Sequence, residues 1–343
     1  MLTTERAAAP PKMSLRFAAL VTLAVAVGHA PAGAWQHNVA GGSGTNAAAA
    51  VAVEPITQDV IGAGTLDFDG DHIFVTRVDP GFGRRRWAYY NFENYPYARS
   101  NALAVTTAPD GTAVVAGVVK RTGTGDDFAV LKVGDFGAPA WVTYLDGDTP
   151  CSDDRALAVA VGSGVVGIEV AAAGALGGHF AVVMLSGSTG AEQWRYTLPN
   201  GEATAVAIAS NGDVVGAGVA GSRFTVVRLG AQDGHQVWKV GSDDGRAAGV
   251  AIDRNGDVVA TGEHGGACGQ APCAAVKLLG STGAQLWRAP YAAVGVASTP
   301  PVAVALAPNG DPILAGTTND AFTVVKLATQ IGNLIGRYQH SAG

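Results

Sequence analysis

One short motif recurs along this chain: a glycine followed four residues later by a tryptophan. The pairs are Gly83 and Trp87, Gly137 and Trp141, Gly190 and Trp194, Gly234 and Trp238, and Gly283 and Trp287. Gly332 and Gly336 keep the spacing without the tryptophan. A period of roughly 40 to 50 residues indicates one supersecondary unit repeated along the chain, so the repeat constrains the fold more than any other feature.

Two further columns run in phase with this motif. An apolar or aromatic residue is followed four residues later, in most repeats, by a base. These pairs are Ile73 and Arg77, Phe128 and Lys132, Phe180 and Met184, Phe224 and Arg228, Cys273 and Lys277, and Phe322 and Lys326. Upstream lies a column of glycines, Gly64, Gly117, Gly174, Gly218, Gly262 and Gly316. Six repeats therefore extend from about Asn46 to Tyr338.

Each repeat reads as four short β-strands. Between Glu202 and Lys239, β-rich runs are joined by Asn211-Gly212, Gly221-Ser222 and Asp233-Gly234, which are typical hairpin turns. Repeated four-stranded units of this length predict an all-β fold, a six-bladed β-propeller of four-stranded antiparallel blades. The first strand of each repeat consists of small residues, which suits the crowded central axis. The tryptophans are expected between neighbouring blades.

The closure of the ring has two candidate strands. Trp35 is in phase with the repeat tryptophans, so the residues around it could complete the last blade. The segment Leu334 to Tyr338 competes for the same outer position. The sequence leaves both alternatives open.

The repeat pattern, an A-V-A-I strand, N-G-D, V-V-x-A-G, F-x-V-V-K-L and T-G-x-x-x-W, resembles the bacterial SBBP-type β-propeller repeats. Its ending also resembles the repeats of PQQ-like propellers. The resemblance covers nearly all of the chain after the N-terminal segment and implies the propeller fold. PQQ-dependent enzymes have eight blades around a central calcium and base, and neither of these groups is assigned here.

The N-terminus has the pattern of a targeting segment. An apolar run from Phe17 to Val27 follows Lys12 and Arg16, and it is shorter than the roughly 20 residues that span a bilayer. We therefore expect a signal peptide over residues 1–34, with Met13 as a possible true start, and a single propeller domain over residues 35–343. The mature chain is expected to have no transmembrane segment and to be secreted, periplasmic or on the cell surface.

Charge argues against one class of partner. The chain has 343 residues, of which 15% are charged, and its formal net charge is -6. Binding to nucleic acid requires clustered cations, so we expect a protein or glycan partner and no nucleic acid.

Three cysteines suit an exported protein only in part. Cys268 and Cys273 are separated by four residues, and we predict a disulfide between them, which mass spectrometry of non-reduced peptides tests. Cys151 is then left over, and its state stays open.

The two faces of the predicted disc differ. Turns between the first and second strands, and between the third and fourth, are short and uniform. The opposite face carries the second-to-third turns and the connections between blades, which vary in length, and such variable loops usually carry function. The side chains expected to bind a ligand there are Tyr95, Tyr97, Asp126, Asp127 and His264.

Three alternating carboxylates suggest a cation site on the same face. Asp67, Asp69 and Asp71 resemble an oxygen-rich calcium loop, although no downstream glutamate completes it. No other cofactor is predicted. A second acidic connection contains Asp146, Asp148, Asp153 and Asp154, and three histidines, His72, His179 and His264, fall in second-to-third loops.

The basic column has a structural interpretation. Asp59, Asp213, Asp257 and Asp311 begin second strands, so each is expected to meet the base of the adjacent third strand as a cross-strand pair, which contributes less than about 1 kcal/mol if it is exposed.

No catalytic motif is present in the sequence, and no catalytic residue is predicted. The leading hypothesis is an exported, non-enzymatic propeller that binds a protein or glycan through its variable face. The alternative is a propeller enzyme, a PQQ-like dehydrogenase or a hydrolase or lyase, with a site in the axial funnel.

Overall fold

The computed structural model describes His37, Val39 and residues 46–67, 70–91, 99–148, 152–164, 167–242, 244–268, 271–290, 303–318 and 321–340. Side chains are described for these residues except 164, 264–268, 271–274 and 318. Twenty-four strands form six four-stranded sheets, and the described residues contain no helix. Accordingly, no membrane-crossing helix occurs in this part of the chain.

Each sheet is built from four consecutive strands paired antiparallel in chain order, as the repeats predict. Blade 1 comprises β1 (Ala47–Val53), β2 (Val60–Asp67), β3 (Asp71–Val78) and β4 (Arg85–Tyr90). Blade 2 comprises β5 (Ser100–Thr107), β6 (Ala113–Arg121), β7 (Gly125–Val133) and β8 (Pro139–Leu145). Blade 3 comprises β9 (Arg155–Gly164), β10 (Gly167–Leu176), β11 (His179–Ser186) and β12 (Glu192–Leu198).

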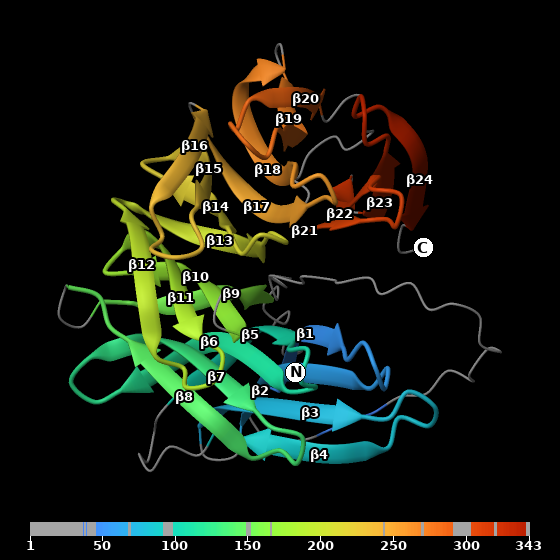
Figure 1. The fold of residues 1–343 in the computed structure, drawn as a ribbon. Coiled ribbons are helices and arrows are strands. Elements are labelled where there is room, and N and C mark those ends of the chain that lie inside the picture. The colour runs from blue at the N-terminus through green and yellow to red at the C-terminus, as the bar shows by residue number, and fades with distance from the viewer. Residues whose placement is uncertain are drawn as a thin grey trace, which may run out of the picture.

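The second half of the chain repeats this arrangement. Blade 4 comprises β13 (Gly201–Ile208), β14 (Val214–Ala220), β15 (Arg223–Leu229) and β16 (Gln236–Ser242). Blade 5 comprises β17 (Gly245–Ile252), β18 (Val258–Cys268), β19 (Ala271–Leu278) and β20 (Gln285–Pro290). Blade 6 comprises β21 (Ala303–Leu306), β22 (Pro312–Thr318), β23 (Ala321–Leu327) and β24 (Leu334–His340). The first strand of every blade lies toward the centre and the fourth toward the rim (Figure 1).

The glycine column of the second strands marks a bulge in the inner strand. The register of β13 against β14 shifts between Ala203 and Ala205, opposite Gly218. A Cβ atom added to Gly218 would lie 2.1 Å from the carbonyl oxygen of Glu202, so only glycine fits there. Gly64, Gly117, Gly174 and Gly262 approach the equivalent carbonyls as closely.

Neighbouring blades interlock through the glycine–tryptophan motif. Gly234 has a φ of 68°, and a Cβ atom added to it would lie 2.5 Å from Cε3 of Trp194 in the preceding blade. The indole N–H of Trp194 donates to the carbonyl of Ala231 in the same turn, at 3.1 Å. Trp141, Trp238 and Trp287 donate in the same way to Gly187, Gly280 and Thr329 of their following blades. The expected packing of tryptophan between blades is confirmed.

The basic column strengthens the same junctions. Arg228 donates to Asp213 of its own blade at 2.9 Å and to the carbonyls of Gly256 and Gly280 of the next blade at 3.1 and 3.0 Å. Lys132 bridges from Asp110 to the carbonyl of Gly187 in blade 3. The bases therefore join blades as well as strands.

The cross-strand pairing predicted for these bases is confirmed, and in blades 1, 4 and 5 the base is buried. Arg77 and Asp59, 2.8 Å apart, are buried. The side chain of Lys277 is only 7% exposed and lies 2.8 Å from Asp253 and 3.6 Å from Asp257. The reason is the next blade, which covers the end of these pairs; in blade 6, which has an uncovered face, Lys326 is 38% exposed. Removing one partner therefore costs more than the ~1 kcal/mol of an exposed pair.

Blade 3 replaces the base with Met184 and leaves a buried acid. Glu169 is 3% exposed, and its Oε2 atom has no hydrogen-bond partner. Burial raises the pKa of Glu169 above its ordinary value of 4.5. The fold thus carries one carboxyl group that favours its neutral form.

Blade 2 departs from the pattern at its last turn. In the other five blades the turn before the fourth strand closes with an N–H bonded to a carbonyl four residues back, as from Gly234 to Gly230. In blade 2 the bond runs from Gly137 to Gly134, because one residue is missing. The indole nitrogen of Trp87, which would meet this turn, has no hydrogen-bond partner.

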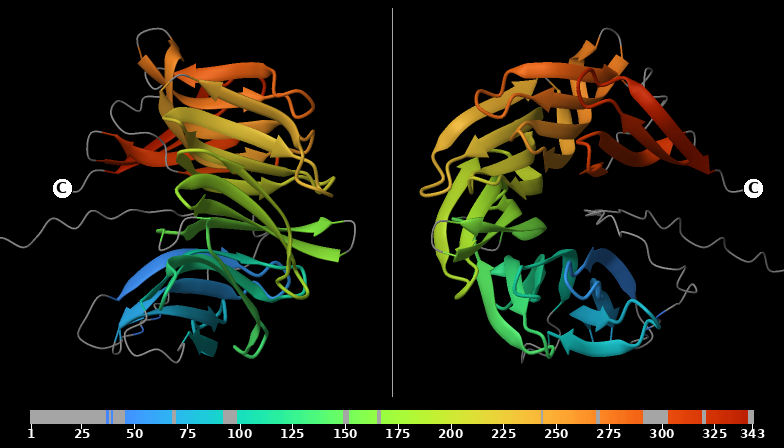
Figure 2. Two further views of the ribbon diagram at one scale, coloured as in Figure 1. Left: turned by 90° about the vertical axis from the view of Figure 1, so that its left-hand side faces the viewer. Right: turned by 45° about the vertical axis from the view of Figure 1, so that its right-hand side comes forward.

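Blade 6 leaves one of its faces uncovered. Alternate residues of β23 are buried on blade 5, whereas Phe322 is 55% exposed, compared with 1% for Phe224. The described strands of blades 1 and 6 stand apart (Figures 1 and 2). The outer strand of blade 6 is β24, so the segment Leu334 to Tyr338 takes the position for which two candidates were open. Trp35 lies outside the described residues.

The interlock predicts the effect of two matched substitutions. Gly234→Ala forces a Cβ atom against Trp194, whereas Gly178, with a φ of 75°, has nothing within 4 Å of an added Cβ. Both variants incur the cost of a left-handed backbone, roughly 1 kcal/mol. Gly234→Ala should therefore lower the free energy of unfolding by at least about 2 kcal/mol more than Gly178→Ala in urea denaturation. Equal losses would show that the turn does not pack on the indole.

The buried carboxyl group predicts a pH-dependent gain in stability. Because its pKa is raised in the folded state, the wild-type protein loses stability as the pH rises from about 4.5 through the folded pKa. Glu169→Gln removes this loss. Its melting temperature should exceed that of the wild type at pH 8 and approach it near pH 4. If the two melting temperatures differed by the same amount at every pH, the pKa of Glu169 would not be raised in the folded protein.

Candidate functional site

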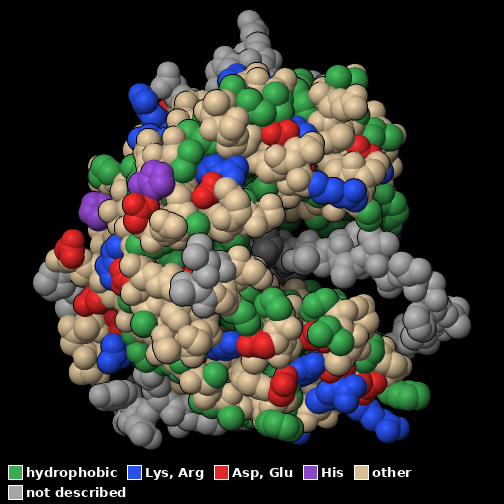
Figure 3. Space-filling model, viewed as in Figure 1, with side chains coloured by type: hydrophobic (Ala, Val, Ile, Leu, Met, Phe, Trp, Pro, Cys, Tyr) green, Lys and Arg blue, Asp and Glu red, His purple; other side chains and the backbone are tan. Residues whose placement is uncertain are grey.

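Charge alone does not single out a site. Side chains of both signs are interspersed over the view in Figure 3. The two faces of the disc are better distinguished by their hydrogen bonds. Turns of the uniform face accept bonds from tryptophans and bases of the preceding blade, whereas the variable-face turns that the structure describes do not take part in that interlock. The variable face is thus the freer one to bind.

Two acidic segments of the sequence meet on the variable face. Asp126 and Asp153 form a backbone bridge, and the N–H of Asp154 donates to the carbonyl of Asp126 at 2.7 Å. The predicted ligand residues Asp126 and Asp127 therefore lie beside the second acidic connection. Asp127 is 1% exposed; its Oδ2 accepts from Arg121 at 3.2 Å and its Oδ1 has no partner.

Asp154 holds this region together. Its carboxylate is fully buried and accepts from the N–H groups of Gly147 at 2.6 Å and Gly177 at 2.5 Å and from the hydroxyl of Ser152 at 3.1 Å. Burial, followed by the hydrogen bond and charge of Asp154, raises the pKa of Asp146 above its ordinary value. Because these donors occupy the carboxylate of Asp154, it joins the connection before β9 to the turn between β10 and β11.

A triad of charges lies at the inner end of blades 3, 4 and 5. Glu202 at the start of β13 accepts from Arg155 of β9 at 2.6 Å and also from Arg246 of β17. Burial raises the pKa of Glu202, but the hydrogen bonds and charges of the two arginines outweigh it, so the pKa lies below the ordinary value. The guanidinium groups are 42% and 51% exposed and can donate further.

The sequence reasoning missed this triad, although a signal existed. Arg155, Glu202 and Arg246 each precede the alanine that pairs with the strand-closing glycine. Aligning the inner strands on that glycine column places all three in one position of the repeat. The residues predicted to bind a ligand were chosen from loops, whereas the triad lies within the first two positions of the inner strands.

A polar cleft of about 620 Å³ opens beside the triad. Arg155 and Glu202 line it, together with Asp153, Asn200, Ser152 and Ser222. Backbone of Gly177, Gly178 and Gly201 completes the wall. The cleft lies between the second-to-third turns of blades 3 and 4, where the sequence predicts binding.

The predicted calcium residues form a tight turn. Asp67 and Asp71 are paired across the end of β2 and β3, and Oδ1 of Asp67 accepts from the N–H of Gly70 at 3.1 Å. Asp69 lies outside the described residues. Within the described ranges no three His, Cys, Asp or Glu side chains converge to hold a metal ion. His72 is buried and its Nδ1 lies 3.1 Å from the carbonyl oxygen of Asn91.

Several other predicted residues fall where the structure describes little. Tyr95, Tyr97 and Cys151 lie outside the described residues. Of His264, Cys268 and Cys273 only the backbone is described, in the hairpin of β18 and β19, where His264 is opposite Cys273 and Cys268 is opposite Ala271. The disulfide and the tyrosine contacts stay predictions.

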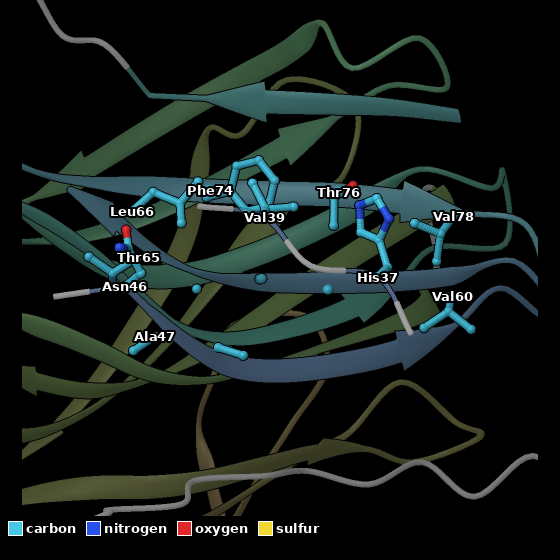
Figure 4. A pocket seen from close by; sticks show the side chains of 14 residues that line it. His37, Val39, Asn46, Ala47, Val60, Thr65, Leu66, Phe74, Thr76 and Val78 are labelled. Carbon is cyan, nitrogen blue, oxygen red and sulfur yellow. The ribbon is translucent and has the colours of Figure 1, made fainter. Parts of the chain in front are cut away.

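An apolar cavity of about 330 Å³ lies on the uncovered side of blade 1. His37 and Val39 lie over β2 and β3, facing Phe74, Thr76 and Val78 (Figure 4). The described residues before β1 thus cover the face of blade 1 that has no neighbouring blade.

Comparisons with known proteins bear on the fold. No family model matches this chain, and no curated protein matches it. Among solved structures, a putative 6-phosphogluconolactonase from Bacteroides uniformis superposes with a TM-score of 0.58 and 10% identity, over 87% of this chain and 88% of its own. The periplasmic gluconolactonase PpgL of Pseudomonas aeruginosa superposes with a TM-score of 0.55 and 14% identity, over 85% of this chain and 88% of its own.

A third similar structure is described as a complex. Sqt1 of Chaetomium thermophilum, bound to the N-terminus of ribosomal protein L10, gives a TM-score of 0.52 and 14% identity, over 86% of this chain and 88% of its own. With six four-stranded antiparallel sheets, the predicted fold is confirmed. The chain is a β-propeller. Such likenesses show the fold alone, because propellers carry unrelated functions.

Proposed function

We propose that this chain is an exported binding protein that recognises a protein or glycan through the variable face of its propeller. The observation that carries the proposal is the polar cleft between blades 3 and 4, with Arg155 and Glu202 in its wall. Its donors and acceptors suit the hydroxyl and amide groups of a hydrated ligand.

The inner strands support binding over catalysis. They are rich in small apolar residues such as those of Ala203 to Ile208, which supply few acids or bases. The charged groups at the mouth of the axis are paired with one another, as in the triad of Arg155, Glu202 and Arg246. The resemblance to SBBP-type repeats and the existence of a peptide-bound structural neighbour are compatible with a binding role.

The tyrosines predicted from the sequence are a second part of the proposal. Tyr95 and Tyr97 fall in the connection between blades 1 and 2, and exposed tyrosines suit sugar rings and protein partners. Asp126 is half-buried on the same face, whereas Asp127 is buried and does not reach a ligand. A ligand that spans more than one blade would use both regions.

The proposal is tested by screening the mature protein against an oligosaccharide array and a random-peptide phage library, and then measuring the selected ligand by calorimetry. Arg155→Ala, or Tyr95→Ala combined with Tyr97→Ala, should weaken binding at least about tenfold with little change in melting temperature. The matched control is Asn211→Ala with Asn255→Ala on the uniform face. It should lower the melting temperature, because Oδ1 of Asn211 accepts from Asp213 and Arg228, and leave affinity unchanged.

The opposite pattern, with binding lost only in the asparagine variant, would show that the site lies on the uniform face and would contradict the proposal. Turnover of the selected ligand would support the enzyme alternative instead.

A further inference from the structure

The shortened turn of blade 2 creates a second surface, on the uniform face at the junction of blades 1 and 2. In blades 3 to 6 the turn supplies a carbonyl for the tryptophan of the preceding blade. In blade 2 that carbonyl is lost with the missing residue. Nη1 of Arg77 donates instead to Oδ1 of Asp135, at 3.0 Å. The buried indole nitrogen of Trp87 is left without an acceptor.

Two phenylalanines are presented to solvent at this junction. Phe82 is 75% exposed and Phe136 is 94% exposed, each at the turn position just before the repeat glycine. Blades 3, 4 and 5 carry Thr189, Asp233 and Thr282 at that position. Such exposed rings contribute nothing to the core, and aromatic side chains are typical of binding surfaces.

Three consecutive arginines flank the phenylalanines. Arg84, Arg85 and Arg86 are all exposed. Arg86 pairs with Asp59 at 2.7 Å, and Arg84 lies over the ring of Phe82 at 5.1 Å. Neither Arg84 nor Arg85 has an ion-pair partner within the described part of the chain. On a chain of net charge -6 this is a local concentration of free positive charge.

These groups line one cleft. Its volume is about 670 Å³, and Phe82, Phe136, Trp87 and the arginines contribute to its wall. Figure 3 shows Lys and Arg side chains gathered over the first blade at the lower right. Two carboxylates also line the cleft, those of Asp79 and Asp135. Asp79 accepts backbone N–H groups of Phe82, Arg84 and Gly81, which lower its pKa, and Asp135 is paired with Arg77.

We propose that this cleft binds an acidic segment of a partner protein that also carries an apolar side chain. Arg84 and Arg85 supply guanidinium forks for carboxylates. Phe82 and Phe136 cover the apolar side chain. The indole nitrogen of Trp87 is buried behind the cleft, so the ring contributes to the wall and does not donate to the segment.

A polypeptide fits better than a nucleic acid. The rest of the chain is acidic and repels an extended polyanion, and tight phosphate binding needs a longer series of cations. An acidic peptide needs only a local match of charge and shape. The surface is separate from the cleft on the variable face, so either site can fail without the other.

The test is fluorescence anisotropy of a fluorescein-labelled peptide of alternating glutamate and phenylalanine, titrated with the full mature protein at low salt. Comparison probes are an all-glutamate peptide, a lysine–phenylalanine peptide and a single-stranded oligonucleotide of equal length. The glutamate–phenylalanine peptide should bind most tightly. Arg84→Glu combined with Arg85→Glu should weaken it at least about tenfold, and added salt should do the same.

Two further variants separate the roles within the cleft. Phe82→Ala combined with Phe136→Ala should lower the affinity for the glutamate–phenylalanine peptide more than the affinity for the all-glutamate peptide. Trp87→Phe should leave the affinity for both peptides unchanged, because the indole nitrogen is buried and out of reach of the peptide. Arg254→Glu is the matched control, an exposed arginine on the same face of blade 5, and should leave affinity unchanged.

The proposal is overturned if the acidic peptides bind no better than the lysine peptide, or if Arg254→Glu weakens binding as much as the double arginine variant. Tighter binding of the oligonucleotide would identify a nucleic-acid surface instead.

Discussion

The structure depends on the contact between each tryptophan and the glycine turn of the following blade. The ring buries the apolar side of the junction, the indole N–H takes a turn carbonyl, and a buried base takes further carbonyls beside it. A four-stranded sheet has two apolar faces, and one blade cannot bury both. This contact lets each blade cover its neighbour with the same residues, which is why one motif recurs along the chain.

The same contact divides the two faces of the disc. Turns that accept tryptophan and basic side chains have fixed length and geometry, so the uniform face is occupied by structural hydrogen bonds. The described turns of the variable face do not accept these inter-blade hydrogen bonds, and the charged triad and the polar cleft lie on that face. The junction of blades 1 and 2 is the exception on the uniform face, because a single missing residue in the turn of blade 2 leaves the buried indole nitrogen of Trp87 without an acceptor.

The fold could be predicted because its determinants are local and periodic. Asn211-Gly212 and Gly234 each specify a turn, and repeating them specifies the sheet order. The sequence did not reveal that Arg77 and Lys277 are buried. The atoms that cover them belong to the next blade, so the sequence of a single repeat does not show them. The triad of Arg155, Glu202 and Arg246 was missed because its members are far apart in sequence and meet only when three blades assemble around the axis. The shortened turn was visible, since Lys132 and Trp141 are nine residues apart and Arg228 and Trp238 are ten.

The most direct measurement of the interlock compares tryptophan-to-phenylalanine substitutions by urea denaturation. Trp194→Phe and Trp238→Phe each remove an inter-blade hydrogen bond, to the carbonyls of Ala231 and Gly280, of which Gly280 keeps its bond from Arg228. Trp87→Phe changes a similarly buried ring that makes no such bond. The first two should lower the free energy of unfolding by about 1 to 2 kcal/mol more than the third. Equal losses at all three positions would contradict the account, because the indole–carbonyl bond would then contribute nothing to holding the blades together.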